Sequence, residues 1–419
     1  MSNNNTMNIT EYVIKNRAKT LDKLPLNPVD SLILSQLSYL KYEGIPELYI
    51  KKDGITIQEV AKSKYVKNLF IDERYAASNK ELFDAVAESK RFGTITIKDF
   101  VNIIDDDWKI QFCAMTCVFE NGTTYVVFRG TDDNLVGWQE DLDMIYKTPI
   151  PAQEKSVWYL NRVAKKIKGN FYVGGHSKGG NLAVYSSMKV SKGIQDKIIR
   201  IFSHDGPGFK PEELSGIAFA RIEGKILKLV PKSSIVGMLL TTKEHYEVVA
   251  CHKIGISQHN PFNWIVEKHD FQRVDQVDKA SEFQNQAINL WVLNLTDEQG
   301  EYLSTQLFDI FEKAGITNLN DMQSNLSGLI TSLRNLATTM NELDPETKNR
   351  LEDIFKMLSD MFFDVMKENM LDNMNSTLEN AKVVVDNVIE NVHKKSSSGN
   401  RTLKKRDRIK AGKNGDSKS

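Results

Sequence analysis

The sequence predicts an α/β fold in which a mostly parallel sheet is covered by helices on both faces. Two observations support this fold class. Between residues 109 and 251, short apolar segments rich in β-branched residues alternate with segments of helical periodicity. One of these strands, at 171–174, runs through a glycine-rich turn directly into a helical pattern, as in strand–turn–helix units of parallel sheets.

Composition and length are those of a globular protein. The 419 residues are 41% hydrophobic and 26% charged, which allows one large domain with an appendage, or two domains. The three cysteines, Cys113, Cys117 and Cys251, form neither a disulfide framework nor a CxxC metal site, so we expect a reducing, cytoplasmic location. No signal-peptide pattern and no apolar run of 18 residues is present, so we expect neither export nor a membrane span.

The first hundred residues predict mainly helices. Residues 1–24 are assigned to an N-terminal segment, and the predicted α/β domain covers 25–315. Apolar spacing after Asp30 and Ser31 predicts a packing helix capped by these two residues, and a second helix is expected around 80–91. Between 44 and 100 the pattern is otherwise mixed.

The central part of the chain then supplies the sheet. Segments 109–119 and 123–128 flank Asn121-Gly122, which is a strong signal for a hairpin of two antiparallel strands. The remaining elements alternate: a helix at 156–167, a strand at 171–174, a helix at 179–190, and strands at 197–202, 225–230 and 246–251.

The C-terminal part of the chain has a different character. In the region 316–393, apolar residues recur every three or four positions, and Asp344-Pro345 separates two amphipathic helices. They predict a helical hairpin or coiled coil that could dock a protein partner, and the alternative is binding to a lipid surface. Residues 394–419 carry a charge of +8 against −8 for the rest of the chain and predict a disordered tail. This tail either solubilises the protein or weakly contacts an acidic membrane surface, and no specific nucleic acid is expected.

The stretch FYVGGHSKGGNLA, which begins at residue 171, contains the motif GxSxG around Ser177. A serine hydroxyl becomes an effective nucleophile when a sharp strand-to-helix turn presents it to a base, and such a turn requires small residues such as Gly175 and Gly179. A glycine-rich structural loop is the alternative interpretation. Acyl transfer also requires donors for the oxyanion, and the N–H of Lys178 and the loop at Thr131, in RGTDDN after the strand 123–128, are the candidates.

YVVFRGTDDNLVGWQEDLDM followed by VGGHSKGGNLAVYSS resembles the class 3 lipases, which are α/β-hydrolases, and more closely a bacterial Mbeg-like branch of that superfamily. The similarity is clearest over 25–264. It implies that Ser177 is the nucleophile, that Thr131 and Lys178 form the oxyanion hole, and that Trp138 and Asp141 shape the site entrance. Lys178 replaces the leucine that is usual in class 3 lipases.

The base and the acid must follow the nucleophile in chain order. His259, in the turn-like QHNP segment, is the best candidate for the base, with His252 next, whereas His176 is expected to play a packing role. For the acid, class 3 lipases carry an aspartate where this chain has Ser234. Asp205, in HDGPG after the strand 197–202, is the alternative orienting carboxylate, or a turn aspartate that binds backbone N–H groups.

These residues predict a serine hydrolase that cleaves a carboxylic ester, with a lipid-like substrate implied by the resemblance, through an acyl-enzyme on Ser177. Such chemistry needs no metal or organic cofactor. Two alternatives remain: a catalytically weak hydrolase fold that serves as an interaction module, and a thioesterase or peptidase that uses the same residues.

Overall fold

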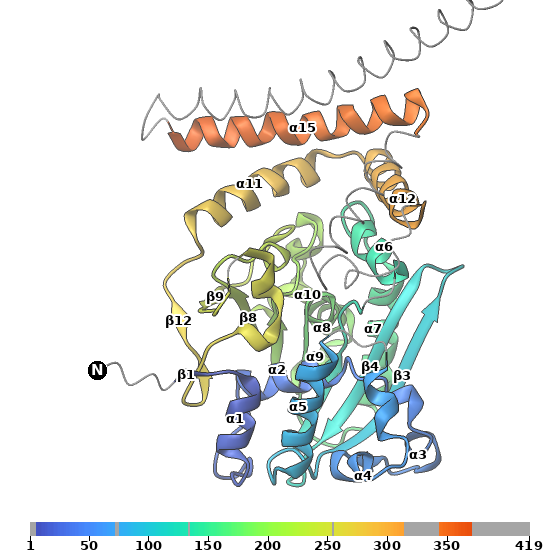
Figure 1. Cartoon of the computed structure of the whole chain (residues 1–419), viewed down its shortest axis with the longest axis vertical. Coiled ribbons are helices and arrows are strands. Elements are labelled where there is room, and N and C mark those ends of the chain that lie inside the picture. The colour runs from blue at the N-terminus through green and yellow to red at the C-terminus, as the bar shows by residue number, and fades with distance from the viewer. Residues whose placement is uncertain (1–5, 72–74, 133–134, 254, 314–342, 371–419) are drawn as a thin grey trace, which may run out of the picture. The chain divides into compact units, whose positions relative to one another are not determined.

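The computed structural model describes residues 6–71, 75–132, 135–253, 255–313 and 343–370 (Figure 1). The chain divides into two units, Met1–Phe362 and Phe363–Ser419, and the fold described below belongs to the first. The predicted boundaries at residues 24, 315 and 393 stay predictions. The helices expected between 316 and 342 and the tail 394–419 lie outside the described residues.

Within the described residues, a nine-stranded sheet forms the centre of the first unit, in the order β12-β9-β8-β7-β6-β5-β4-β3-β2. The five strands β5 to β9 are parallel to one another, whereas β2, β3, β4 and β12 pair antiparallel at the two sides. The α/β-hydrolase fold is therefore confirmed, with a sheet that is mixed beyond its parallel centre. The strands are β2 (Ile55–Thr56), β3 (Thr96–Asp105), β4 (Ile110–Val118), β5 (Thr124–Phe128), β6 (Phe171–His176), β7 (Ile198–His204), β8 (Ile226–Pro231), β9 (Tyr246–Val249) and β12 (Arg273–Val274).

The predicted hairpin around Asn121-Gly122 is the turn between β4 and β5, where Gly122 has a φ of 86°. Its outer neighbour β3, one of the two long cyan strands in Figure 1, was missed by the sequence pattern. A register shift between Lys98 and Val101 in β3 explains this, because a bulge interrupts the alternation of inward and outward side chains.

Helices cover both faces of the sheet, as expected, and alternate residues of β5 point into two separate cores. Tyr125 and Val127 pack with residues of α1 (Ile9–Asn16), α2 (Pro28–Leu37) and α5 (Ala76–Glu88). Val126 and Phe128 pack with residues of α7 (Pro151–Ala164) and α8 (Lys178–Lys189). This two-sided burial agrees with the continuous apolar sequences of the central strands.

The predicted cap of α2 at Asp30 and Ser31 is wrong, because the helix begins three residues earlier. Asn27 is the N-cap and Pro28 is the first helical residue; the Asn27 side chain accepts the Asp30 N–H at 3.1 Å and the Asp30 carboxylate accepts the Asn27 N–H at 3.0 Å. Asp30 therefore belongs to a capping box, and the predicted start lies one turn inside the helix.

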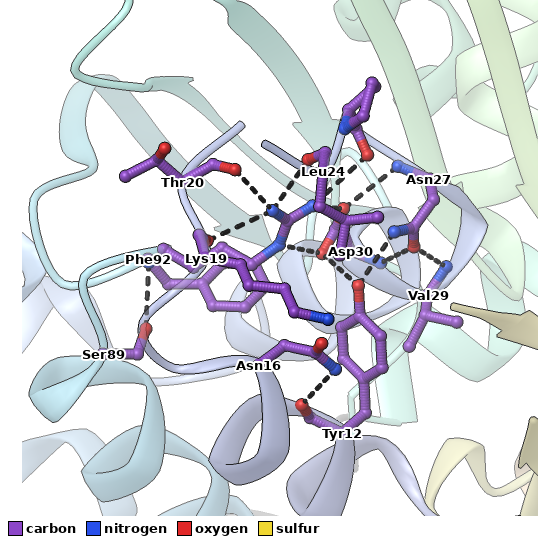
Figure 2. Close-up of polar contacts among 12 residues, drawn as sticks. Tyr12, Asn16, Lys19, Thr20, Leu24, Asn27, Val29, Asp30, Ser89 and Phe92 are labelled. Carbon is purple, nitrogen blue, oxygen red and sulfur yellow. Dashed lines mark hydrogen bonds and ion pairs between the residues drawn. The ribbon is translucent and has the colours of Figure 1, made fainter. Parts of the chain in front are cut away.

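The Asp30 carboxylate is fully buried between α2 and the segment after α5. Arg91 forms an ion pair with it, with Nε 2.8 Å from Oδ1, and the Tyr12 hydroxyl donates to Oδ1 at 3.2 Å. Figure 2 shows Tyr12 and Asn27 directed toward Asp30, together with the backbone of Leu24, whose carbonyl accepts from Arg91 at 2.8 Å. Residues 12–30 are thus held to the body of the fold by a saturated polar cluster.

Among the described residues, the sheet is followed by the helices α11 (Lys279–Asn294), α12 (Asp297–Lys313) and α15 (Pro345–Met370). The predicted helix start at Asp344-Pro345 is confirmed, since the Asp344 carboxylate accepts the N–H groups of Glu346 and Thr347 at 3.0 and 2.9 Å. The first half of α15 joins α11 through a hydrogen bond of 3.0 Å from the Trp291 indole to the Ile354 carbonyl. None of the helices in the described ranges is long and apolar enough to cross a membrane.

Candidate active site

Ser177 lies on a strained turn between β6 and α8. Its φ of 58° and ψ of −133° are rare for a residue with a side chain, and its N–H donates to the carbonyl of His204 at 2.9 Å. The flanking glycines permit this turn: a Cβ on Gly175 would lie 2.3 Å from the Gly179 carbonyl carbon, and a Cβ on Gly179 would lie 2.2 Å from the Phe128 carbonyl oxygen. The motif therefore has the geometry of a nucleophile elbow rather than of a relaxed loop.

Asp205 and His259 meet on the same edge of the sheet, just beyond the carboxyl ends of the parallel strands. Asp205 follows β7, and His259 ends the 3-10 helix Gly255–His259; His259 Nδ1 lies 2.6 Å from Asp205 Oδ2. Asp205 is buried and His259 is partly exposed, with 19% of its side chain accessible. A histidine held at Nδ1 by a carboxylate has its Nε2 free for proton transfer.

Asp205 is itself fixed by the loop after β8. Ser234 donates to Oδ1 at 2.5 Å and the Gly237 N–H donates to the same oxygen at 3.1 Å. A Cβ on Gly237 would lie 2.3 Å from Asp205 Oδ1, so a side chain there would displace the carboxylate. Ser234 thus contacts Asp205 rather than His259, and of the two residues considered for the acid, Asp205 is the one that touches the imidazole.

The loop that carries His259 is held from two sides. Gln258 is buried, accepts the Ser233 N–H at 2.8 Å through its side chain, and accepts the Trp264 indole N–H at 2.9 Å through its carbonyl. His176 lies against His259, with ring centroids 4.6 Å apart, and its Nε2 is 2.9 Å from the His259 carbonyl oxygen. His176 therefore supports the imidazole of His259, in keeping with its expected packing role.

No hydrogen bond joins the Ser177 hydroxyl to His259 among the described residues. Bonds of this type are often long until the reacting carbonyl is in place. The other histidine considered for the base, His252, is exposed, and its backbone N–H donates to the Asn263 carbonyl at 2.8 Å. Glu247 in β9, another carboxylate that follows Ser177 in the chain, pairs with Arg273 at 2.5 Å rather than with His259.

Thr131 lies beside the elbow, at the end of β5. A Cβ on its neighbour Gly130 would come 3.1 Å from the Ser177 Cβ, so the loop passes directly over the serine. The Thr131 hydroxyl donates to Asp141 Oδ2 at 2.6 Å. Since that proton is engaged, the donor that Thr131 retains for an oxyanion is its backbone N–H. The side chain of Trp138 lies outside the described residues.

Lys178 provides the feature of this site that sequence reasoning missed. Its N–H belongs to the first residue of α8 and has no partner within the helix, whereas its side chain is buried, with 1% accessible. The ammonium lies 2.8 Å from Glu140 Oε2, 2.9 Å from Gln111 Oε1 and 3.7 Å from Asp141 Oδ1. Lys178 thus links the start of α8 to helix α6 (Leu135–Asp143) and, through Asp141, to Thr131.

The ammonium of Lys178 stays charged in this environment. Burial alone lowers the pKa of Lys178, but the carboxylates of Glu140 and Asp141 outweigh that effect and raise it above the ordinary value. Glu140 is fully buried, and its second oxygen accepts the Ala152 N–H at 2.7 Å. The pair is therefore a saturated buried ion pair directly behind the elbow.

His204, next to Asp205, is buried as a neutral imidazole. Its Nε2 lies 2.8 Å from the Ser31 hydroxyl, and burial lowers its pKa from 6.5 to about 3. In the unfolded chain the ordinary histidine pKa of about 6.5 applies. Between these two values the unfolded chain binds one proton more than the folded chain, so the free energy of unfolding decreases as the pH falls.

We therefore expect His204 to destabilise the fold in mild acid. Lowering the pH from 7 to 5 should reduce its contribution to the free energy of unfolding by about 2 kcal/mol. Urea unfolding of the wild type and of His204→Phe at both pH values measures this difference. The variant should lose less stability than the wild type over the interval, and equal losses in both proteins would contradict the assignment.

The parallel centre of the sheet, the strained turn at Ser177 and the adjoining Asp205–His259 pair define a lipase-like member of the α/β-hydrolase folds. A model of the Mbeg1-like family matches residues 86–309, which is more than half of the chain. The chain belongs to the Mbeg1-like family. This family and the lipase-like fold are those that the residues around Thr131 and Ser177 suggested from the sequence.

Three solved lipase structures resemble the chain at low identity. A fungal lipase–inhibitor complex described as a model for interfacial activation is 16% identical, covers 53% of this chain and 77% of its own, and has a TM-score of 0.33. A triacylglycerol lipase described as having a serine protease triad is 15% identical, covers 53% of this chain and 77% of its own, and has a TM-score of 0.33. The native Rhizomucor miehei lipase propeptide complex is 16% identical, covers 53% of this chain and 66% of its own, and has a TM-score of 0.29. None of the curated proteins matches the chain in sequence.

Proposed function

We propose that this protein is a serine hydrolase that cleaves carboxylic esters, with a lipid-like ester as substrate, through an acyl-enzyme on Ser177. The main support is the 2.6 Å contact between His259 and Asp205 on the edge of the sheet where the strained turn presents Ser177. A carboxylate bound to an imidazole, and a serine on a sharp turn at the same side of the sheet, are the parts that acyl transfer requires.

In the proposed first step, Ser177 Oγ attacks the acyl carbonyl carbon while His259 Nε2 takes the hydroxyl proton. Asp205 accepts the Nδ1–H of His259 and stabilises the imidazolium. The N–H groups of Lys178 and Thr131 would bind the oxyanion, and the C–O bond to the leaving alcohol then breaks as His259 returns its proton to that oxygen.

In the second step, a water molecule gives its proton to His259 and its oxygen attacks the acyl carbon. The Ser177–acyl bond breaks, the serine recovers a proton from His259, and the carboxylic acid is released. His176, packed against His259 and bound to its carbonyl, would hold the imidazole in place through both steps.

A fluorophosphonate probe tests this function directly, because it phosphonylates an activated serine. The folded wild type should be labelled, and Ser177→Ala should not be. Ser187→Ala, which removes a buried hydroxyl of the same helix, is the matched control and should keep the label. If the folded wild type is not labelled, the protein is not a serine hydrolase, and the alternative of a non-catalytic interaction module would be favoured.

A second measurement identifies the class of substrate that donates the acyl group. Hydrolysis of p-nitrophenyl esters, acyl-thioesters and peptides should be compared at matched acyl length, because one triad serves all three classes. We expect the highest kcat/KM for the esters. A preference for thioesters or peptides would show that the substrate class is different, with Ser177 still the nucleophile.

A further inference from the structure

A cleft lies at the opposite end of the parallel strands from Ser177. It encloses about 630 Å³, and its lining includes Thr124, the first residue of β5, and Asn170, which precedes β6. Ser177 follows the opposite end of β6, and a six-residue strand is about 20 Å long. This cleft is therefore separate from the candidate active site, and the proposed hydrolysis does not use it.

Two walls and a floor form the cleft. One wall is the segment 48–54, at and after helix α3 (Glu47–Ile50), and the other is the segment 163–170, at and after the end of α7. Parts of β3, β4 and β5 make the floor, where Phe100 and Val118 contribute apolar surface. The ring of Tyr49, which is 62% exposed, stands edge-on to Phe100 with centroids 6.4 Å apart.

Lysines dominate the polar part of the lining. Five of them face the cleft against one carboxylate, and they come from both walls and the floor: Lys51, Lys52, Lys98, Lys166 and Lys168. The single carboxylate, Asp99, is already paired with Lys166 and lies 3.6 Å from Arg162.

Three of the five lysines keep an uncompensated charge. Lys51 pairs with Glu59 at 2.8 Å, and Lys166 pairs with Asp99. Across the described residues, Lys52, Lys98 and Lys168 have no ion pair. Like charges on facing walls repel each other, and an anion between the walls would relieve that repulsion.

We propose that this cleft binds a small amphiphilic anion, in which a single apolar chain carries a carboxylate or a phosphate head. The head lies between Lys52 and Lys168, since an ammonium group is a compact point charge suited to either anion. The apolar chain lies over Phe100 and Val118 beside Tyr49, which removes its surface from water. A volume of about 630 Å³ is in the range of sites for small ligands.

Isothermal titration calorimetry with soluble probes tests the site. Octyl phosphate and octanoate carry the two heads, octyl glucoside is the uncharged control, and inorganic phosphate is the control without an apolar chain. We expect the two anionic amphiphiles to bind about tenfold or more tightly than either control, and their affinity to fall with added salt. Whichever of the two binds more tightly identifies the head group.

Variants locate the binding. Lys52→Glu/Lys168→Glu reverses one charge on each wall and should weaken both anionic amphiphiles about tenfold or more. Lys279→Glu/Lys313→Glu, at exposed positions on α11 and α12, makes the same change in net charge and should leave the affinity unchanged. Circular dichroism checks the fold, and Lys52→Ser/Lys168→Ser repeats the test without charge reversal.

Three results would overturn the proposal: no binding of either anionic amphiphile to the wild type, equal binding of octyl glucoside, or equal loss of affinity in the two charge-reversed variants. Ser177→Ala should bind both anions like the wild type, since the cleft lies at the opposite edge. The outcome is therefore independent of whether Ser177 is a nucleophile.

Discussion

Asp205→Asn is expected to lower kcat for ester hydrolysis by about 10⁴-fold while the protein stays folded. The asparagine side chain is the same size, but it can neither stabilise the imidazolium of His259 nor enforce the tautomer that keeps Nε2 free to accept the serine proton. The contact concerned is the 2.6 Å approach of His259 Nδ1 to Asp205 Oδ2. Steady-state hydrolysis of a p-nitrophenyl ester measures kcat, and thermal unfolding verifies the fold.

Ser234→Ala is the matched control for that experiment. Ser234 donates to the other oxygen of the same carboxylate at 2.5 Å and does not contact His259. Removing one hydrogen bond to a charged group should lower kcat by about 10- to 100-fold at most. Near-normal activity in Asp205→Asn, or a larger loss in Ser234→Ala than in Asp205→Asn, would show that the acid has been assigned to the wrong residue.

Lys178→Met is expected to reduce the free energy of unfolding by about 3–5 kcal/mol, because it leaves the carboxylate of Glu140 buried without a counter-charge. Both side chains are essentially inaccessible, and the ammonium also binds Gln111. Urea unfolding at pH 7 measures the loss. We expect the fold itself to tolerate replacement of the pair, since apolar residues of similar volume can replace a buried ion pair.

The double variant Lys178→Leu/Glu140→Leu provides the control for Lys178→Met. It should recover most of the lost stability, because no charge is left buried alone. A single variant that costs less than about 1 kcal/mol would mean that Glu140 is not buried as described. A double variant that is as unstable as the single one would show that packing, rather than charge, explains the loss.

Much of the fold could be predicted because its signals are local. The hairpin at Asn121-Gly122, the strand before Ser177 and the helix start at Asp344-Pro345 depend on neighbouring residues in the sequence, and the structure has all three. The bulged strand β3 and the true start of α2 were missed for related reasons. A register shift hides the alternation of β3, and Asp30 looks like a cap although it occupies the third helical position.

A site residue could be predicted from the sequence only where its neighbours in the sequence define its geometry. Ser177 lies in a motif whose local geometry defines it, whereas the choice between Asp205 and Ser234 depends on which one reaches a histidine more than 20 residues away. The burial of Lys178 against Glu140 could not be predicted from the sequence, because the side chains of lysine and glutamate are normally exposed to solvent. The presence of lysine where class 3 lipases have leucine was the one available signal.

The pairing of β1 (Thr6–Met7) with β10 (Val266–Glu267), in a small sheet separate from the nine-stranded one, can form only late in synthesis. These strands are 260 residues apart in the chain, and β10 lies seven residues after His259. At about 5–20 residues per second, the ribosome needs roughly 13–52 s to make the intervening chain. During that time the start of the chain has no strand to pair with, so this small sheet forms only after the segment that carries His259 has been synthesised.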